Sequence, residues 1–294
     1  MERRSVELMV QTSPAPVLVE QASTDAQMLA LWLHGRSVGT TRAYGSDARA
    51  FLAHCGKSLK AVTVGDVQAF GSSLAGLATA SQARKLSAVK SLLSFAHRLG
   101  YTAFNVGAVV KLPAIKATLA ERIMGEADMH RLLALETDPR NAALLRLIYG
   151  GGLRISEACG LKWRDLQPRD ESGQATVYGK GGKTRMVLLP LSVWRGLVQI
   201  RGEAGPEAPV FTSQRRGHLD PSQVHRLVKA AAARAGLPPA VSAHWLRHAH
   251  ASHALDRGAP IHLVQATLGH ASVATTGRYL HARPSDSSGR YLAL

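Results

Sequence analysis

The sequence predicts a mainly α-helical protein of two domains, an N-terminal helical bundle and a C-terminal domain of helices with a small antiparallel β-sheet. Three observations favour this fold class. Apolar residues recur with the 3.6-residue period of helices through the first half. A proline-containing stretch without periodicity then interrupts the pattern. In the second half, two short alternating runs flank a Gly-Gly pair, which is typical of a β-hairpin.

Composition fits this organisation and points to a class of partner. With 294 residues, of which 46% are hydrophobic, the chain is long enough to bury two cores. Its formal net charge is +16, and basic residues outnumber acidic ones in both halves, which favours a polyanion such as nucleic acid. A solvated arginine-rich surface would give the same charge, so charge alone does not identify the partner.

Cysteine usage and hydropathy exclude other classes. Cys55 and Cys159 lie in separate halves within apolar helical patterns, so we expect two packed thiols and no disulfide framework. No apolar run has the length of a membrane span, and the basic N-terminus is followed by no signal-peptide core. We therefore expect a cytoplasmic protein with no membrane partner.

The first half is predicted to be a flexible leader, residues 1–22, followed by a bundle of about four short helices, residues 23–110. Two helices are defined by apolar faces, which consist of Tyr44, Ala48, Phe51, Leu52 and Cys55 in one and of Leu86, Val89, Leu93 and Ala96 in the other. Charged residues between these positions, including Asp47, Arg84 and Lys85, are predicted to lie away from the apolar faces.

A linker is predicted at residues 111–122, because Pro113 lies there in a stretch without periodicity. The second domain, residues 123–294, opens with a helix that has an acidic first turn at Glu126.

The middle of the second domain is predicted to contain a hairpin. A helix at 141–149 ends in the glycine triplet 150–152. Strands are expected at 175–179 and 184–190, joined by a two-residue Gly-Gly turn within residues 180–183 that carries a lysine on each side.

Four helices are predicted after the hairpin, with boundaries marked by capping residues. They run from Asp220 to Gly236, from Ser242 to Gly258, from Pro260 to Gly269, and onward from about Ser272.

Several polar residues of this domain form a set with a shared chemistry. His244 and Arg247 are three residues apart on one helix, so they project from one face and an anion fits between them. His270 directly follows the glycine that ends its helix, and Tyr279 lies nine residues later on a helix that can return it to the same cleft. Arg154 lies two residues after a run of three glycines, which allow a ligand to approach the backbone closely, and its guanidinium can grip phosphate oxygens. Each residue alone is more often structural; together they suit attack on a phosphodiester by a tyrosine.

These residues lie in recognisable motifs. Gly152-Leu-Arg-Ile-Ser-Glu157, the lysine hairpin, His244-Trp-Leu-Arg247, Leu268-Gly-His270 and Tyr279 resemble the signature boxes of the tyrosine recombinases, the phage integrase family, and their order is most similar to Xer-type members. The resemblance covers about residues 125–281. The first half resembles the family's SAM-like core-binding domain only in size, helicity and charge.

The resemblance implies a site-specific DNA recombinase that encircles a double-stranded recombination site as a C-shaped clamp and acts as a tetramer on two duplexes. It implies that Arg154 and Arg247 clamp the phosphate and that Lys180 is the general acid. It further implies that His244 accepts the proton, that His270 donates to the phosphate and that Tyr279 is the nucleophile. Attack by the tyrosine would leave a 3′-phosphotyrosyl link, so no cofactor, neither metal nor ATP, is required.

The sequence alone does not choose between Lys180 and Lys183, and the resemblance favours Lys180. The DNA sequence, the outcome (integration, excision or resolution) and the need for a second recombinase or an accessory protein stay open.

Four other interpretations of the sequence are less well supported. Residues His244, His248, His250 and His253 could form a metal site, although the glutamate of the zinc-protease motif is missing and Arg247 would repel the ion. A type IB topoisomerase would use similar residues without a specific site. A catalytically silent DNA-binding regulator would not need all six groups, and a helix-turn-helix at 222–258 lacks a supporting turn.

Overall fold

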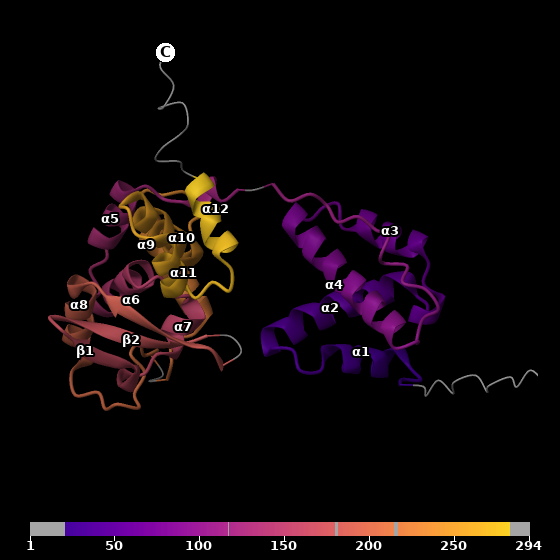
Figure 1. Cartoon of the computed structure of the whole chain (residues 1–294), viewed down its shortest axis with the longest axis horizontal. Coiled ribbons are helices and arrows are strands. Elements are labelled where there is room, and N and C mark those ends of the chain that lie inside the picture. The colour runs from indigo at the N-terminus through magenta and orange to yellow at the C-terminus, as the bar shows by residue number, and fades with distance from the viewer. Residues whose placement is uncertain (1–20, 117, 180–181, 215–216, 283–294) are drawn as a thin grey trace, which may run out of the picture. The chain divides into compact units, whose positions relative to one another are not determined.

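A computed structural model describes residues 21–116, 118–179, 182–214 and 217–282 of the protein. The chain divides into two compact units, Met1–Lys116 and Ala117–Leu294 (Figure 1). The predicted leader up to residue 20 and Lys180 lie outside the described residues. None of the helices within these ranges is both long and apolar enough to cross a lipid bilayer.

The N-terminal unit is the predicted helical bundle. Its helices are α1 (Asp25–Leu33), α2 (Val38–Cys55), α3 (Val64–Ser73) and α4 (Thr79–Arg98). The apolar faces predicted for α2 and α4 pack against each other, with Phe51, Val89 and Leu93 almost fully buried. Gly100 follows the end of α4 with a φ of 70°, a left-handed conformation that glycine adopts without strain.

One prediction for this bundle was wrong. Asp47 lies not on an outer face of α2 but in the interior, where only 1% of its surface is exposed. Its carboxylate pairs with the guanidinium of Arg84 and with Nζ of Lys85, which is 3.1 Å away. An unpaired carboxylate would be costly at this position, so the two cations of α4 turn inward to compensate it.

The C-terminal unit contains helices that were predicted from the sequence together with one that was not. They are α5 (Glu126–Ala134), α6 (Pro139–Gly150), α7 (Ile155–Gly160), α8 (Leu191–Arg201), α9 (Pro221–Arg234), α10 (Ala243–Asp256), α11 (Ile261–Leu268) and α12 (Val273–Ala282). Helix α8 was not predicted. Asp220 caps α9 through its side chain, whereas the side chain of Ser242 makes no capping bond although the residue precedes α10.

The sheet is antiparallel and contains β1 (Leu166–Arg169), β2 (Ser172–Tyr178) and β3 (Thr184–Leu189), in that order. Strand β1 was not predicted. The last pair of the β2–β3 ladder is Tyr178 and Thr184, and the N–H of Gly179 donates to the carbonyl of Lys183 at 2.7 Å. The connection is therefore longer than the predicted two-residue turn.

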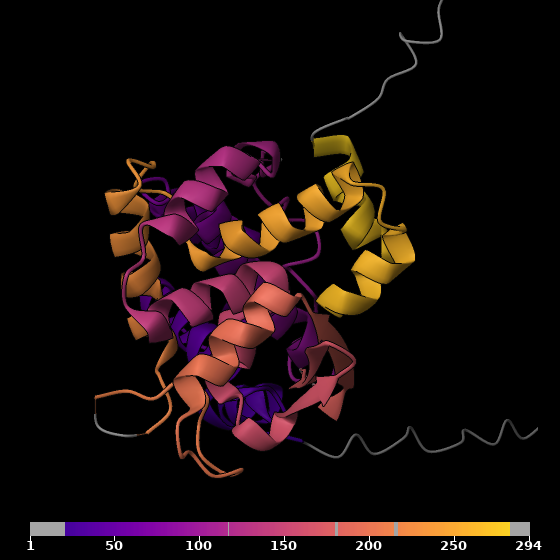
Figure 2. The same ribbon diagram turned by 90° about the vertical axis from the view of Figure 1, so that its left-hand side faces the viewer.

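Three helices near the end of the chain form a small subdomain. Figure 2 shows α10 crossing the C-terminal unit toward the yellow helices α11 and α12, and the three helices pack on one another. Their apolar contact includes Ala251 of α10, Val264 and Leu268 of α11, and Tyr279 of α12. Helix α11 also contacts β3, so the predicted site residues come from adjoining elements.

Candidate active site

The turn before Arg154 depends on Gly152. This residue has a φ of 61°, and a Cβ added to it would lie 2.8 Å from Cδ2 of His250 and 3.0 Å from the side chain of Leu268. Only glycine satisfies both conditions without displacement of a neighbour. The glycines were predicted to allow close approach of a ligand, and the structure shows that Gly152 allows close approach of a histidine from α10. Arg154 follows as the N-cap of α7.

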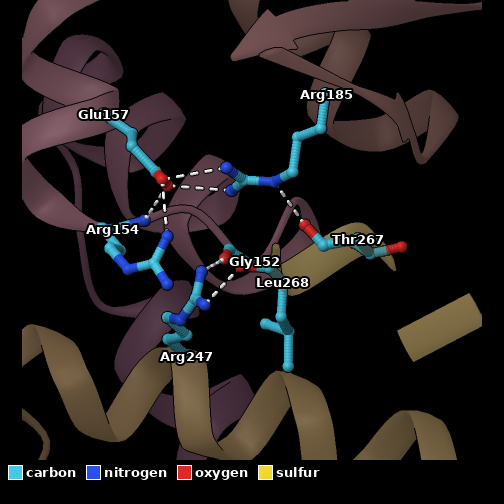
Figure 3. Close-up of polar contacts among 7 residues, drawn as sticks. All are labelled: Gly152, Arg154, Glu157, Arg185, Arg247, Thr267 and Leu268. Atoms are coloured by element: carbon cyan, nitrogen blue, oxygen red, sulfur yellow. Dashed lines mark hydrogen bonds and ion pairs between the residues drawn. The ribbon is translucent and has the colours of Figure 1, made fainter. Parts of the chain in front are cut away.

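A single buried carboxylate organises two arginines (Figure 3). Glu157 accepts hydrogen bonds from the backbone N–H and from Nη1 of Arg154, both at 2.8 Å. The same carboxylate accepts two bonds of 2.9 Å from Arg185 on β3. Burial alone would raise the pKa of Glu157, but the bonds from Arg185 and Arg154 outweigh burial and hold that pKa at about 2. Glu157 is therefore ionised at neutral pH and fixes both guanidinium groups.

Arg185 also connects the hairpin to the end of α11. Its Nε donates to the carbonyl oxygen of Thr267 at 2.7 Å, and its side chain lies against Gly269. Arg185 thereby joins strand β3 to Arg154, through Glu157, and to the turn that precedes His270.

Arg247 is held by backbone carbonyls. Only 4% of its surface is exposed, and its Nη1 and Nη2 donate to the carbonyl oxygens of Gly152 and Leu268 (Figure 3). A guanidinium has five N–H groups, so further donors are available to a ligand. Burial, followed by the charge of Arg154, lowers the pKa of Arg247 to about 10, and the group keeps its charge at neutral pH.

His270 leaves the end of α11 as predicted. Gly269 has a φ of 63° and ends the helix in a left-handed turn. Nδ1 of His270 then shares a hydrogen bond of 2.9 Å with the hydroxyl of Thr276 on α12. Burial and the nearby arginines, first Arg247, lower the pKa of His270 to about 4, so its imidazole is neutral at pH 7.

Tyr279 lies inside this group, with 5% of its surface exposed. Its ring is nearly parallel to that of His270, with centroids 6.4 Å apart. Its hydroxyl is 2.7 Å from Nδ1 of His248 on α10. His244 lies one turn earlier on α10 and stacks on His248, with centroids 6.2 Å apart, but it is exposed. Burial raises the pKa of Tyr279, and the charges of Arg247, Arg278 and Arg154 oppose that rise.

The structure thus brings together four of the six predicted residues, Arg154, Arg247, His270 and Tyr279, and places His244 one helical turn from His248, which contacts the hydroxyl of Tyr279. Lys180 lies outside the described residues, and Lys183 is exposed beside the hairpin. Sequence reasoning missed three side chains with direct contacts to the group: Glu157, Arg185 and His248. Their only sequence signal was position, since Glu157 and His248 lie within or next to the motifs and Arg185 follows the hairpin.

The histidine cluster of α10, which lies within the described residues, does not form a metal site. Nδ1 of His250 donates to the carbonyl of Tyr149 at 2.7 Å, and Nε2 of His253 donates to the carbonyl of Met124 at 2.9 Å. Within the described ranges, no three histidine, cysteine or acidic side chains are grouped to bind an ion. These two histidines instead tie α10 to α6 and to the segment before α5.

Comparison with known proteins agrees with the motifs. The model described as "Phage integrase family" matches residues 117–286, more than half of the chain, and that described as "Phage integrase, N-terminal SAM-like domain" matches residues 28–100. Tyrosine recombinase XerC of Methylobacterium sp. (strain 4-46) is 33% identical over 300 residues, which cover 92% of this chain and 93% of the relative. Tyrosine recombinase XerC of Xylella fastidiosa (strain M23) is 34% identical over 260 residues, which cover 84% and 87%.

Solved structures share the fold. A lambda integrase dimer bound to a COC' core site aligns with a TM-score of 0.72 at 19% identity, covering 91% of this chain and 80% of that one. XerH site-specific recombinase bound to difH aligns with a TM-score of 0.69 at 21% identity, covering 88% and 82%. With the family model, the relatives and the site all in agreement, this chain belongs to the phage integrase family, the family of the tyrosine recombinases.

Proposed function

We propose that this protein is a site-specific DNA recombinase that cuts and rejoins strands through a 3′-phosphotyrosyl link, with Tyr279 as the nucleophile. The observation that carries the proposal is the charge of the site around that tyrosine. Arg154 and Arg185 pair with the carboxylate of Glu157, whereas Arg247 bonds to two backbone carbonyls, so three guanidinium groups face one carboxylate in this part of the described structure. A phosphodiester would supply the missing negative charge.

The two arginines of the predicted clamp are prepared for that phosphate in different ways. Arg247 is buried and immobilised by two carbonyls, so it can bind an oxygen without losing further side-chain freedom. The side chain of Arg154 is 37% exposed and is anchored by Glu157 through only one of its terminal nitrogens. Cations fixed before the substrate arrives stabilise charge that develops on a phosphate in the transition state.

The proposed reaction is a transesterification. The hydroxyl oxygen of Tyr279 forms a bond to phosphorus, the bond from phosphorus to the 5′-oxygen breaks, and the energy of the broken bond is kept in the phosphotyrosyl ester for rejoining. In this proposal Lys180 supplies the proton to the leaving oxygen. His244 accepts the tyrosine proton, because its exposed ring can release that proton to water, and the N–H of neutral His270 donates to a non-bridging oxygen.

The partner in this proposal is a double-stranded recombination site, bound by several copies of the protein. One structural neighbour is a lambda integrase tetramer bound to a Holliday junction, and we propose a tetramer on two duplexes for this chain as well. A second recombinase or an accessory protein is compatible with the same site. The reaction would take place in the cytoplasm without metal or ATP. The alternatives, a type IB topoisomerase and a silent regulator, are not favoured, because the relatives are tyrosine recombinases.

Covalent capture tests the proposal. The bound sequence would first be selected from randomised duplexes, and a suicide substrate with a nick near the cleavage position would then be built from it. Wild-type protein should become covalently attached to this DNA, whereas Tyr279→Phe should bind it without attachment. Tyr178→Phe, which alters an exposed tyrosine of the same unit, is the matched control and should behave as wild type. Continued attachment by the Tyr279→Phe protein would reject the nucleophile.

A plasmid assay separates recombination from relaxation. Recombination should require two copies of the selected sequence and leave a supercoiled plasmid without that sequence unchanged. Relaxation of such a plasmid would favour the topoisomerase interpretation.

A further inference from the structure

His248 makes the one side-chain hydrogen bond that the hydroxyl of Tyr279 has within the described residues. Nδ1 of His248 lies 2.7 Å from that hydroxyl, and the two rings are tilted by 48° with centroids 5.7 Å apart. Neither of the two other candidate histidines bonds to this hydroxyl: His270 bonds to Thr276, and His244 lies one turn earlier on α10, stacked on His248. The resemblance assigned no role to His248.

The hydrogen bond between His248 and Tyr279 links the nucleophile to the helix that carries the phosphate-binding Arg247. His248 is the next residue after Arg247, so one helix, α10, carries both a phosphate-binding guanidinium and the contact to the nucleophile. Helix α12 is in turn tied to histidines at two positions, Thr276 to His270 and Tyr279 to His248. Together these bonds fix the distance and orientation of the phenol relative to the site where the phosphate would lie.

The environment of His248 suits an acceptor of a hydrogen bond better than an acceptor of a proton. The ring is half-buried and is approached by His244 and by the cations of Arg247, Arg122 and Arg278. Burial, and then these neighbours, lower the pKa of His248 to about 4. The imidazole is neutral at pH 7 and has one nitrogen available as an acceptor. An imidazolium formed there would face several positive charges and could not readily pass its proton to water.

We propose that His248 is a positioning residue for the nucleophile, which accepts the hydrogen bond of the Tyr279 hydroxyl at Nδ1 and aims its oxygen at the phosphate held by Arg247. The inference rests on the proposed function, because it assigns a reactive role to Tyr279. It differs from assignment of a general base: His248 orients the hydroxyl before the attack, and in the proposed reaction the tyrosine proton then passes to His244. An orientation effect of this kind changes the rate of cleavage and leaves DNA binding unchanged.

Two substitutions of His248 test the hydrogen bond. In His248→Phe the ring is kept and the acceptor is lost, whereas in His248→Asn the amide oxygen can occupy nearly the position of Nδ1 and accept the same bond. With protein in excess over a nicked suicide substrate, His248→Phe should lower the single-turnover cleavage rate constant by about 10-fold or more. His248→Asn should recover most of that loss. Neither should change the dissociation constant in a gel shift by more than about twofold.

Two controls separate a positioning role from a structural one. His130→Phe alters an exposed histidine of α5 and should cleave at the wild-type rate. The midpoint of thermal unfolding of every variant should be measured as well. If His248→Phe and His248→Asn unfold at similar temperatures but cleave at different rates, loss of folding does not explain the difference.

The outcomes distinguish this inference from the proposed function. Wild-type or faster cleavage by His248→Phe, while Tyr279→Phe stays inactive, would overturn the inference and leave the nucleophile in place. An equal loss of cleavage rate in His248→Phe and His248→Asn would also overturn it, since restoring a hydrogen-bond acceptor would then have no effect. Covalent attachment by Tyr279→Phe would instead reject the proposed function itself.

Discussion

Substitution of Glu157 by glutamine should lower the free energy of unfolding by an amount that depends on pH. Glu157 has a pKa of about 2 in the folded protein because of its hydrogen bonds to Arg185 and Arg154, against ~4.3 in an unfolded chain. The difference corresponds to about 3 kcal/mol of folding free energy at neutral pH. Because the folded pKa is depressed, this contribution is present above the unfolded pKa and is lost as pH falls through the folded one. By about pH 3.5, about 1 kcal/mol of it should be gone.

Urea unfolding at two pH values measures this effect. At neutral pH, Glu157→Gln should lower the free energy of unfolding of the C-terminal unit by about 3 kcal/mol, and the gap to wild type should narrow by about 1 kcal/mol near pH 3.5. Tryptophan fluorescence is a suitable probe, because Trp163, Trp194 and Trp245 lie in the same unit as Glu157.

The matched control is Glu207→Gln. Glu207 also pairs with two cations, Lys162 and Arg164, but it is largely exposed, so its loss should have little effect. The reasoning about the buried carboxylate would be refuted if Glu157→Gln lowered the free energy of unfolding no more than Glu207→Gln does, or if its effect did not change with pH.

Three further predictions concern the arginines, the glycine turn and metal. Arg154→Ala should lower the cleavage rate by about 10²-fold and leave the stability of the fold nearly unchanged. Arg247→Ala should lower both the cleavage rate and the stability, because it leaves two buried carbonyls without their hydrogen-bond donor. Cleavage assays and thermal unfolding will show whether the two variants differ in this way. Gly152→Ala should lower the free energy of unfolding by about 2–4 kcal/mol, since its Cβ would meet His250 at a φ of 61°, and a chemical denaturation curve equal to that of wild type would contradict this. Cleavage should survive excess EDTA, and loss of cleavage that zinc restores would revive the metal interpretation.

The regular parts of the fold were predictable because they depend on local pattern. The apolar period of α4, the acidic start of α5 and the left-handed glycine after α11 are each encoded within a few residues. Helix α8 and strand β1 were missed, since α8 has no strong capping residue and β1 is only four residues long. The burial of Asp47 was missed because its compensating cations lie on a different helix.

The site shows the same division between local and distant information. Arg154, Arg247 and Tyr279 could be proposed from the sequence because their motifs are short and specific. Arg185 was not found, since its partner Glu157 lies 28 residues earlier and the pair forms only when β3 folds beside α7. His248 stood next to a predicted residue, yet the sequence carried no sign that its ring, rather than that of His244, would reach the hydroxyl.

The hydrogen bonds that hold Arg247 and Arg185 affect how much positive charge the site can offer to a phosphate. Both donate to carbonyls in the last turn of α11, those of Leu268 and Thr267, where the helix macrodipole places a partial negative charge of roughly half an electron. Peptide dipoles can fix the direction of a guanidinium without cancelling its charge, whereas each additional carboxylate would remove a full unit. Glu157 already neutralises one arginine. Because the further anchors of Arg185 and Arg247 are helix carbonyls and not carboxylates, the three guanidinium groups keep a net charge of about +2 to attract an incoming phosphate.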